Sequence, residues 1–332
     1  MQDFRPPFLL RGAHVQSVLA SSGIRRAAVL RNASAMLAAS SDEVVDCGGG
    51  VQLLLHHAPS PIPGTARMAL LIHGWEGSGQ STYMLAAANR LWQSGYRVLR
   101  LNLRDHGDSH HLNRELFHSC RLDDAIGALR WAQDKFPGER TMLGGYSLGG
   151  NFALRIAALA GSAGLRIDRV AAVCPVLDPA ETMHALDGGW IGYRLYFMRK
   201  WRRSLERKRE VFPELYKFGD LGRFRTLESM TDFFVREYTE YPDLMTYLRG
   251  YALTGDRLSS LEVPASMLMA ADDPVIPVGD LARIAKPASL HIETARFGGH
   301  CGFLGSYSLE SQLDDYLVKK FDGDAQHRSR AA

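Results

Sequence analysis

Ser147 lies at the centre of Gly145-Tyr146-Ser147-Leu148-Gly149, a G-x-S-x-G pattern between an apolar run and a helical one. A serine on such a strand-to-helix turn presents its Oγ at the end of a sheet, where it can attack a carbonyl carbon. We expect the two glycines to keep Cβ atoms out of a turn that has no room for them. The backbone N–H of Leu148, at the start of the helix, is available to a developing oxyanion. The pattern therefore predicts a nucleophilic serine.

Acidic residues and a histidine follow Ser147 at the ends of two later predicted strands. Residues 264–270 form an apolar run that leads to Asp272 and Asp273, and residues 290–294 lead to His300. A neutral histidine can take the serine proton as a general base and later protonate the leaving group, while a carboxylate orients the imidazole. The order serine, acid, histidine is one of the known chain orders of a catalytic triad.

Three aspartates compete for the role of the acid. Asp178 follows a strand predicted over 170–176, and Asp272 and Asp273 are adjacent to each other. Asp273 is favoured, because the Asp-Pro-Val-Ile-Pro stretch that it begins fits a loop after a strand better. Asp272 is expected to shape the same loop by hydrogen bonding.

A second oxyanion donor is expected after the buried strand predicted over 67–72. The loop begins His73-Gly74-Trp75, and a backbone N–H from such a loop is the usual partner of the N–H that follows the nucleophile. We favour the N–H of Trp75, since Gly74 permits a tight turn just before it. His73 is expected to stabilise the loop by hydrogen bonding, because His300 already fills the position of the base.

Short stretches along the whole chain occur in an order that resembles one branch of a known family. They are Phe4–Leu9, Gly12–Ser17, His73–Ser78, Gly145–Asn151, Asp272–Pro274 and Gly298–Phe303. Together they resemble the YheT-like branch of the α/β hydrolases, which includes the ABHD1- and ABHD3-type proteins. The resemblance implies a carboxylic-ester hydrolase with Ser147, Asp273 and His300 as its triad.

The composition favours one hydrolase domain in a reducing compartment. A chain of 332 residues with 46% hydrophobic content can fill a large core, and a net charge of +3 is too small to indicate nucleic-acid binding. The cysteines and histidines lack metal-type spacing, so we expect no metal and no cofactor. No apolar run reaches the length of a membrane span and no signal-peptide core is present, which predicts a cytoplasmic protein.

Alternating strand and helix patterns predict an α/β-hydrolase fold, a mostly parallel central sheet flanked by helices. Residues 41–178 and 258–322 are assigned to this core. Residues 1–40 form an N-terminal arm, and residues 179–257, which break the alternation, form a helical cap insertion. The small, polar residues 323–332 are expected to be a flexible tail.

The cap insertion is rich in aromatic residues, which predicts an apolar pocket for the acyl group of a small-molecule ester. Residues 194–209 hold eight basic residues among apolar ones. One interpretation is weak contact with a membrane surface through this helix, but a solvated helix face is favoured. Other hypotheses are a lipase, thioesterase or acyltransferase with the same triad, or a non-catalytic protein that binds a ligand or partner. The oligomeric state is not predicted.

Overall fold

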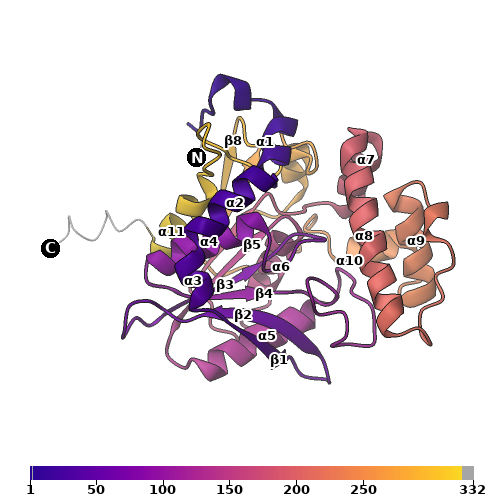
Figure 1. Cartoon of the computed structure of the whole chain (residues 1–332), viewed down its shortest axis with the longest axis horizontal. Coiled ribbons are helices and arrows are strands. Elements are labelled where there is room, and N and C mark those ends of the chain that lie inside the picture. The colour runs from indigo at the N-terminus through magenta and orange to yellow at the C-terminus, as the bar shows by residue number, and fades with distance from the viewer. Residues whose placement is uncertain (2, 324–332) are drawn as a thin grey trace.

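An eight-stranded sheet organises the computed structural model, which describes residue 1 and residues 3–323 (Figure 1). The strands are β1 (Ser41–Asp46), β2 (Gln52–Ala58), β3 (Arg67–Ile72), β4 (Arg97–Leu101), β5 (Arg140–Tyr146), β6 (Arg169–Val173), β7 (Ala265–Ala270) and β8 (Leu290–Ala295). Their order across the sheet is β1-β2-β4-β3-β5-β6-β7-β8. β2 pairs antiparallel with both β1 and β4, and all other pairs are parallel. The predicted mostly parallel sheet is confirmed.

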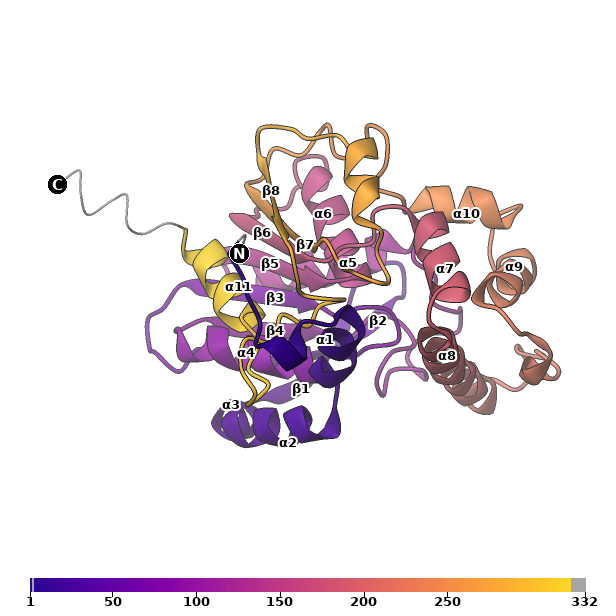
Figure 2. The same ribbon diagram turned by 90° about the horizontal axis from the view of Figure 1, so that it is seen from above.

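Helices cover both faces of this sheet (Figures 1 and 2). α4 (Thr82–Gln93) and α11 (Leu313–Asp322) pack together on one face, and α5 (Leu122–Lys135) and α6 (Leu148–Ala158) pack on the other. β3 illustrates the consequence, since five of its six residues are buried. Central strands that are covered on both faces consist of continuous apolar runs, so their positions could be predicted from the sequence.

Two strands differ from their predicted form for local reasons. The strand predicted over 170–176 ends at Val173, because the next residue, Cys174, has a left-handed backbone with φ of 43°. The edge strand β1 carries no apolar run that would reveal it, since only Val45 among its six residues is buried.

The N-terminal arm crosses the sheet's α4 side as four short helical pieces, η1 (Phe8–Leu10), α1 (Ala13–Ala20), α2 (Gly23–Asn32) and α3 (Ser34–Ala38). Arg25 of α2 is buried and donates to the carbonyl oxygens of Ala20 and Leu309. This contact fixes the arm to the segment before α11. Of the predicted tail, residues 324–332 lie outside the described residues.

The chain between β6 and β7 forms helices that stand to one side of the sheet, at the right of Figure 1. They are α7 (Pro179–Gly188), α8 (Ile191–Val211), α9 (Leu227–Tyr238) and α10 (Leu244–Gly250), with a 3-10 turn, η2 (Leu221–Arg223), between α8 and α9. A second such turn, η3 (Val278–Arg283), follows β7. In the described part of the chain, no helix is both long and apolar enough to span a bilayer.

Candidate active site

Ser147 occupies the turn between β5 and α6 in a strained conformation. Its φ of 53° and ψ of −119° lie where residues with a Cβ are rarely found. A Cβ on Gly145 would lie 2.1 Å from the carbonyl oxygen of Gly149, and one on Gly149 would lie 2.1 Å from that of Ile72. The two glycines therefore allow a turn this tight, as the sequence predicts.

Ser147, His300 and Asp273 form a continuous hydrogen-bonded chain. The distance from Ser147 Oγ to His300 Nε2 is 3.0 Å, and that from His300 Nδ1 to Asp273 Oδ2 is 2.9 Å. The other carboxylate oxygen of Asp273 accepts hydrogen bonds from the N–H groups of Val275 and Ile276, at 2.8 and 3.0 Å. The carboxylate is fully buried and held from two sides, so it can fix both the orientation and the tautomer of the imidazole.

Opposing effects set the pKa of His300. Burial, the largest single effect, lowers the pKa of the imidazole, but the charges of Asp273 and Cys301 and the hydrogen bond to Asp273 together more than reverse this and raise the pKa to about 9. The same interaction would stabilise the imidazolium that forms when the serine proton is transferred. The site is therefore suited to moving a proton between an oxygen nucleophile and a leaving group.

The two rival aspartates lie elsewhere in the network. Asp272 Oδ1 accepts a hydrogen bond from the N–H of Gly299 at 2.9 Å, so it shapes the loop that carries the histidine. Asp178 caps α7 by accepting from the N–H of Ala180, and it pairs with Arg283 at 2.9 Å. Neither carboxylate is hydrogen-bonded to the imidazole.

The loop after β3, which runs beside Ser147, has one backbone N–H with no hydrogen-bond acceptor among the described residues. The N–H of Gly74 donates to the hydroxyl of Tyr83 at 2.9 Å, and that of Glu76 donates to His106 Nε2 at 3.2 Å. Within the described residues, no acceptor is found for the N–H of Trp75 or of Leu148. These are the two groups that the sequence predicts as oxyanion donors.

His73 and Gly74 hold this loop by different means. His73 is fully buried, its Nδ1 lies 2.8 Å from the carbonyl oxygen of Gly74, and its Nε2 accepts from the N–H of Leu103 at 3.1 Å. A tight turn does begin at Gly74, since the N–H of Gly77 donates to its carbonyl oxygen at 2.9 Å, but Gly74 has no positive φ, so the turn does not need a glycine there for its backbone angles. A Cβ there would lie 3.2 Å from the Cβ of Ser147 and 3.3 Å from the carbonyl oxygen of Tyr146, so the glycine provides space.

One face of the cap helix α8 packs against the oxyanion loop, which is the loop after β3 that carries Trp75. The ring of Trp75 stacks on Phe197 at 5.4 Å between centroids and meets Trp201 edge-on at 5.4 Å. Lys200, between them, donates from Nζ to the carbonyl oxygen of Glu76. Spacings of three and four residues bring these side chains to the same side of the helix. The loop that carries the predicted Trp75 donor is thus positioned by the cap as well as by the sheet.

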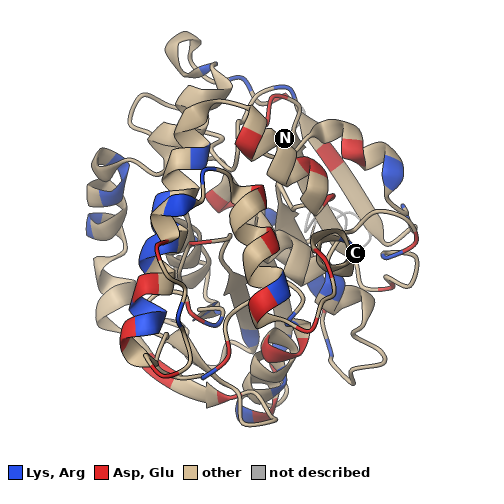
Figure 3. Cartoon of the chain, turned by 90° about the vertical axis from the view of Figure 1, so that its right-hand side faces the viewer, with Lys and Arg blue, Asp and Glu red and all other residues tan. Residues whose placement is uncertain are grey.

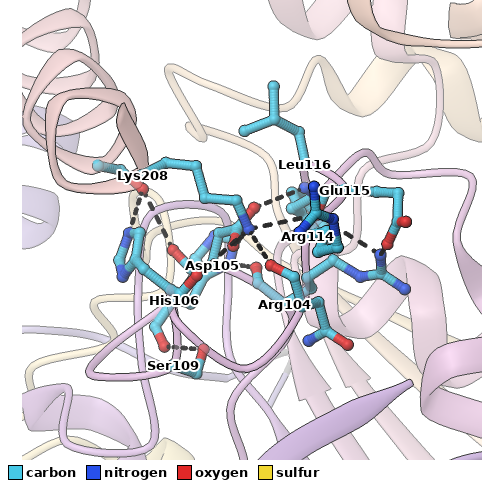
Figure 4. Close-up of polar contacts among 12 residues, drawn as sticks. Arg104, Asp105, His106, Ser109, Arg114, Glu115, Leu116 and Lys208 are labelled. Atoms are coloured by element: carbon cyan, nitrogen blue, oxygen red, sulfur yellow. Dashed lines mark hydrogen bonds and ion pairs between the residues drawn. The ribbon is translucent and has the colours of Figure 1, made fainter. Parts of the chain in front are cut away.

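A buried ion pair fixes the same helix two turns further along (Figure 4). Lys208 Nζ is 2.7 Å from Asp105 Oδ1, and it also donates to the carbonyl oxygens of His110, Asn113 and Glu115. The Lys208 side chain is completely buried, and that of Asp105 is 6% exposed. A buried charge is tolerated only when it is paired and hydrogen-bonded, as it is here.

The basic residues of 194–209 are largely occupied within the molecule. Six of the eight donate hydrogen bonds to other groups of the protein: Arg194, Lys200, Arg202, Arg207, Lys208 and Arg209. Figure 3, which faces the cap, shows basic and acidic residues intermixed on this side of the molecule. Lys208 is inside the protein, so the expectation of a solvated basic face is wrong for that residue.

A cavity of about 720 Å³ lies between the cap and Ser147. Its wall includes Ser147, His300 and Trp75 on the core side, and Met183, Leu186, Tyr193, Phe197 and Trp201 on the cap side. Arg26 and Lys200 also line it, and no carboxylate does among the described residues. The space suits an apolar group placed beside the serine, with a neutral or anionic group at its edge.

The arm supplies contacts to the site that the sequence analysis did not assign. The N–H of His300 donates to Ser17 Oγ at 2.8 Å. The fully buried Gln16 binds the carbonyl oxygens of Leu10 and Leu304 and the N–H of Leu304. The matching stretch Gly12–Ser17 was the signal for these residues, but a short motif far from the nucleophile gives no indication of what it contacts.

Cys174, His300 and Cys301 are the one group of potential metal ligands found within the described residues. Their ligand atoms lie within 4.8 Å of one another. The group is not evident from the sequence, because the two cysteines follow different strands, β6 and β8, and lie 127 positions apart along the chain, at 174 and 301.

Comparison with known proteins gives consistent matches. A family model described as the alpha/beta hydrolase fold matches residues 70–304. YheT of Escherichia coli (strain K12), an esterase by name, is 27% identical over 263 residues, which are 75% of this chain and 76% of YheT. ABHD3 of Mus musculus, a phospholipase by name, is 22% identical over 268 residues, which are 76% of this chain but 62% of ABHD3.

A solved structure agrees with these matches at the level of the fold. It is that of a serine hydrolase from the bacterium Cycloclasticus zankles, with a TM-score of 0.57 and 17% identity, covering 86% of this chain and 98% of that one. The predicted fold and the resemblance to the YheT-like branch are confirmed.

Proposed function

The chain belongs to the α/β-hydrolase family, and from this premise we propose that it is a serine hydrolase that cleaves carboxylic esters through an acyl-enzyme. One observation carries the proposal: a strained serine whose Oγ is 3.0 Å from a histidine that a buried aspartate holds at 2.9 Å. This is the arrangement of nucleophile, base and orienting acid that acyl transfer requires.

The proposed reaction has two halves. Ser147 Oγ attacks the ester carbonyl carbon while His300 Nε2 accepts the hydroxyl proton, and the N–H groups of Trp75 and Leu148 stabilise the oxyanion. As the tetrahedral intermediate collapses, the C–O bond to the alcohol breaks and His300 returns the proton to the leaving oxygen. Water then attacks the acyl-enzyme with His300 again as the base, which releases the carboxylic acid and restores Ser147. Asp273 holds the imidazole throughout.

The cavity supports an ester with an apolar acyl group. Its cap-side wall is formed by aromatic and aliphatic side chains, and each methylene that they bury would contribute about 0.8 kcal/mol. A phospholipid-like ester, as the name of ABHD3 suggests for that relative, is a second candidate, because the wall carries Arg26 and Lys200 and no carboxylate among the described residues. Thioesterase or acyltransferase activity would use the same groups with a different leaving group or acceptor.

We further propose a weak contact of the basic cap helix α8 with a membrane surface, aided by exposed apolar residues at and beside the start of this helix. Trp190 and Tyr196 line the cavity and are 49% and 50% exposed, and Ile191 and Leu195 beside them are 53% and 59% exposed. Flotation with neutral and anionic vesicles tests this. Binding that depends on Trp190 and Tyr196 supports the contact, and absence of binding to either kind of vesicle contradicts it.

Labelling with a fluorophosphonate, followed by a series of p-nitrophenyl esters from acetyl to palmitoyl, tests the proposed activity. Ser147→Ala should lose labelling and at least about a thousandfold of turnover while its melting temperature stays close to that of the wild type. Ser162→Ala, on the exposed turn after α6, is the matched control and should retain both. Labelling that persists in Ser147→Ala, or a well-folded wild type that hydrolyses no ester, would contradict the proposal.

A further inference from the structure

Two thiols lie beside the histidine of the proposed triad. Cys174 follows the last residue of β6, and Cys301 follows His300 on the loop after β8. The sulfur atoms and a ring nitrogen of His300 all fall within 4.8 Å of one another. Two sulfur atoms and one imidazole nitrogen, from two separate loops, therefore lie close together beside Ser147.

Both cysteines are held in a conformation that residues with a Cβ seldom adopt. Their φ values are 43° for Cys174 and 57° for Cys301. Such positions cost on the order of 1–3 kcal/mol and tend to cluster at functional sites. The surrounding sheet and turn must impose these angles, because nothing in a free chain favours them. The two sulfur atoms are thus positioned by the fold.

We propose that Cys174, Cys301 and His300 form a binding site for a thiophilic divalent cation such as Zn²⁺, and that the bound cation inhibits the enzyme. Two sulfurs and one imidazole nitrogen are preferred zinc ligands, and a fourth tetrahedral position is left for water or Ser147 Oγ. Binding forms two metal–sulfur bonds and releases the two thiol protons to solvent.

The geometry needs only a small contraction. Zinc–sulfur bonds of about 2.3 Å place two sulfurs of a tetrahedral site roughly 3.8 Å apart, so the present separation of at most 4.8 Å must close by about 1 Å or less. Cys174 is fully buried, but Cys301 lines the cavity, which gives the cation a path from solvent.

The partner of the imidazole also suits a metal ligand. His300 Nδ1 is 2.9 Å from Asp273, which leaves Nε2 as the nitrogen that can bind a cation, once it gives up its 3.0 Å hydrogen bond with the hydroxyl of Ser147. A histidine that binds zinc commonly donates its other N–H to a carboxylate in this manner. The Nε2 lone pair that would accept the serine proton is the same one that would bind the cation, so the two uses exclude each other. The inhibitory part of the inference rests on the proposed function, whereas the binding part does not.

Cd²⁺ is the probe, because cadmium–thiolate bonds absorb in the ultraviolet and report binding without any need for activity. The reduced full chain should bind one Cd²⁺ per molecule with this absorption, and EDTA should reverse it. Cys174→Ser and Cys301→Ser should each lose the absorption, and Cys47→Ser and Cys120→Ser are the matched controls that should keep it. Ser147→Ala should also bind, which separates the site from catalysis.

Inhibition is measured on each variant relative to its own rate without metal. Zn²⁺ should block fluorophosphonate labelling of the wild type, and Cys174→Ser or Cys301→Ser should raise the concentration that halves labelling by at least about tenfold, the effect of losing a strong ligand. Absorption that persists in both cysteine variants, or that disappears in Cys47→Ser or Cys120→Ser, would overturn the site. Binding without any effect on labelling would overturn the inhibition alone.

Discussion

The hydroxyl oxygen of Ser17 accepts a 2.8 Å hydrogen bond from the backbone N–H of His300, and so ties α1 of the arm to the proposed base. The neighbouring Gly299 lies so close to α1 that a Cβ would be 2.3 Å from the carbonyl oxygen of Ala13. The hydroxyl of Ser17 is itself oriented by donating to that same carbonyl at 2.8 Å. The histidine loop is therefore set against the arm, which belongs to the site although it lies outside the sheet.

Removing this hydroxyl should impair turnover more than folding. In Ser17→Ala the N–H of His300 loses its acceptor, which costs on the order of 1–3 kcal/mol, and we expect kcat to fall about tenfold as the imidazole loses its position. Ser17→Thr keeps the hydroxyl and should recover most of the rate. Ser40→Ala deletes a comparable bond at the end of the arm and serves as the control. Equal kcat values for Ser17→Ala and the control would contradict the role of Ser17.

Substitutions of the two adjacent aspartates should differ greatly in their effect on turnover. Asp273→Asn should lower turnover by about four orders of magnitude, because an amide does not select the tautomer that the base requires. In Asp272→Asn the amide oxygen can still accept from the N–H of Gly299, so the loss should stay within roughly tenfold. Turnover of p-nitrophenyl acetate by folded protein is the measurement. A larger loss for Asp272→Asn would reverse the assignment of the acid.

Gly74→Ala tests whether space beside the nucleophile is what the glycine provides. A new Cβ would press on the Cβ of Ser147 at 3.2 Å and displace either the serine or the oxyanion loop. Displacements of this kind cost roughly ten- to a hundredfold in turnover. Gly161→Ala is the control, because a Cβ there meets no atom within 4 Å. An undiminished kcat in Gly74→Ala would mean that the loop can move to accommodate the Cβ without loss of turnover, and would contradict the proposed role of Gly74.

Lys208→Met should destabilise the protein strongly. It leaves Asp105 buried without its counter-charge, which typically costs about 3–5 kcal/mol. Adding Asp105→Asn removes that charge, and the amide oxygen can keep the hydrogen bond from the N–H of Phe117, so the double variant should regain part of the loss. Urea unfolding of the single and double variants measures the coupling. Additive losses would show that the two residues do not act as a pair.

Glu76 predicts a specific dependence of stability on pH. Burial raises the pKa of its carboxyl group from 4.5 to about 8, and the charge of Lys200 offsets only part of this. An acid with a raised pKa in the folded state contributes stability that is fully present below pH 4.5 and is lost as the pH rises through about 8. Glu76→Gln cannot ionise. Its melting temperature relative to the wild type should therefore rise across this interval, and a constant difference would contradict the expectation.

The nucleophile and the sheet were predictable because their signals are local. An apolar run, two glycines around a serine, and an acid and a histidine after later strands each carry a recognisable pattern over a few residues. Their assembly follows from the rule that the carboxyl ends of neighbouring parallel strands lie at one edge.

The roles that the sequence could not predict depend on contacts between segments that are far apart in the chain. Serine is most often found at protein surfaces, so Ser17 carries no signal of its contact in the sequence. Only the fold brings its hydroxyl to the loop of His300. Lys208 reads as one charge in a basic run, yet the Asp105 loop, 103 positions away, places it inside the protein. Gly74 shows the same limit, since its need for space is set by Ser147 and not by its own backbone.

The packing of α8 against the oxyanion loop has a consequence for evolution and engineering. A cap that touched only substrate could be exchanged between relatives as a module, with specificity changing and the chemistry left intact. Here Phe197, Lys200 and Trp201 hold the segment that carries a proposed oxyanion donor. A transplanted cap must therefore bring matching residues at these three positions. Without them the recipient would gain a new pocket but lose the position of the oxyanion donor, and its rate acceleration with it.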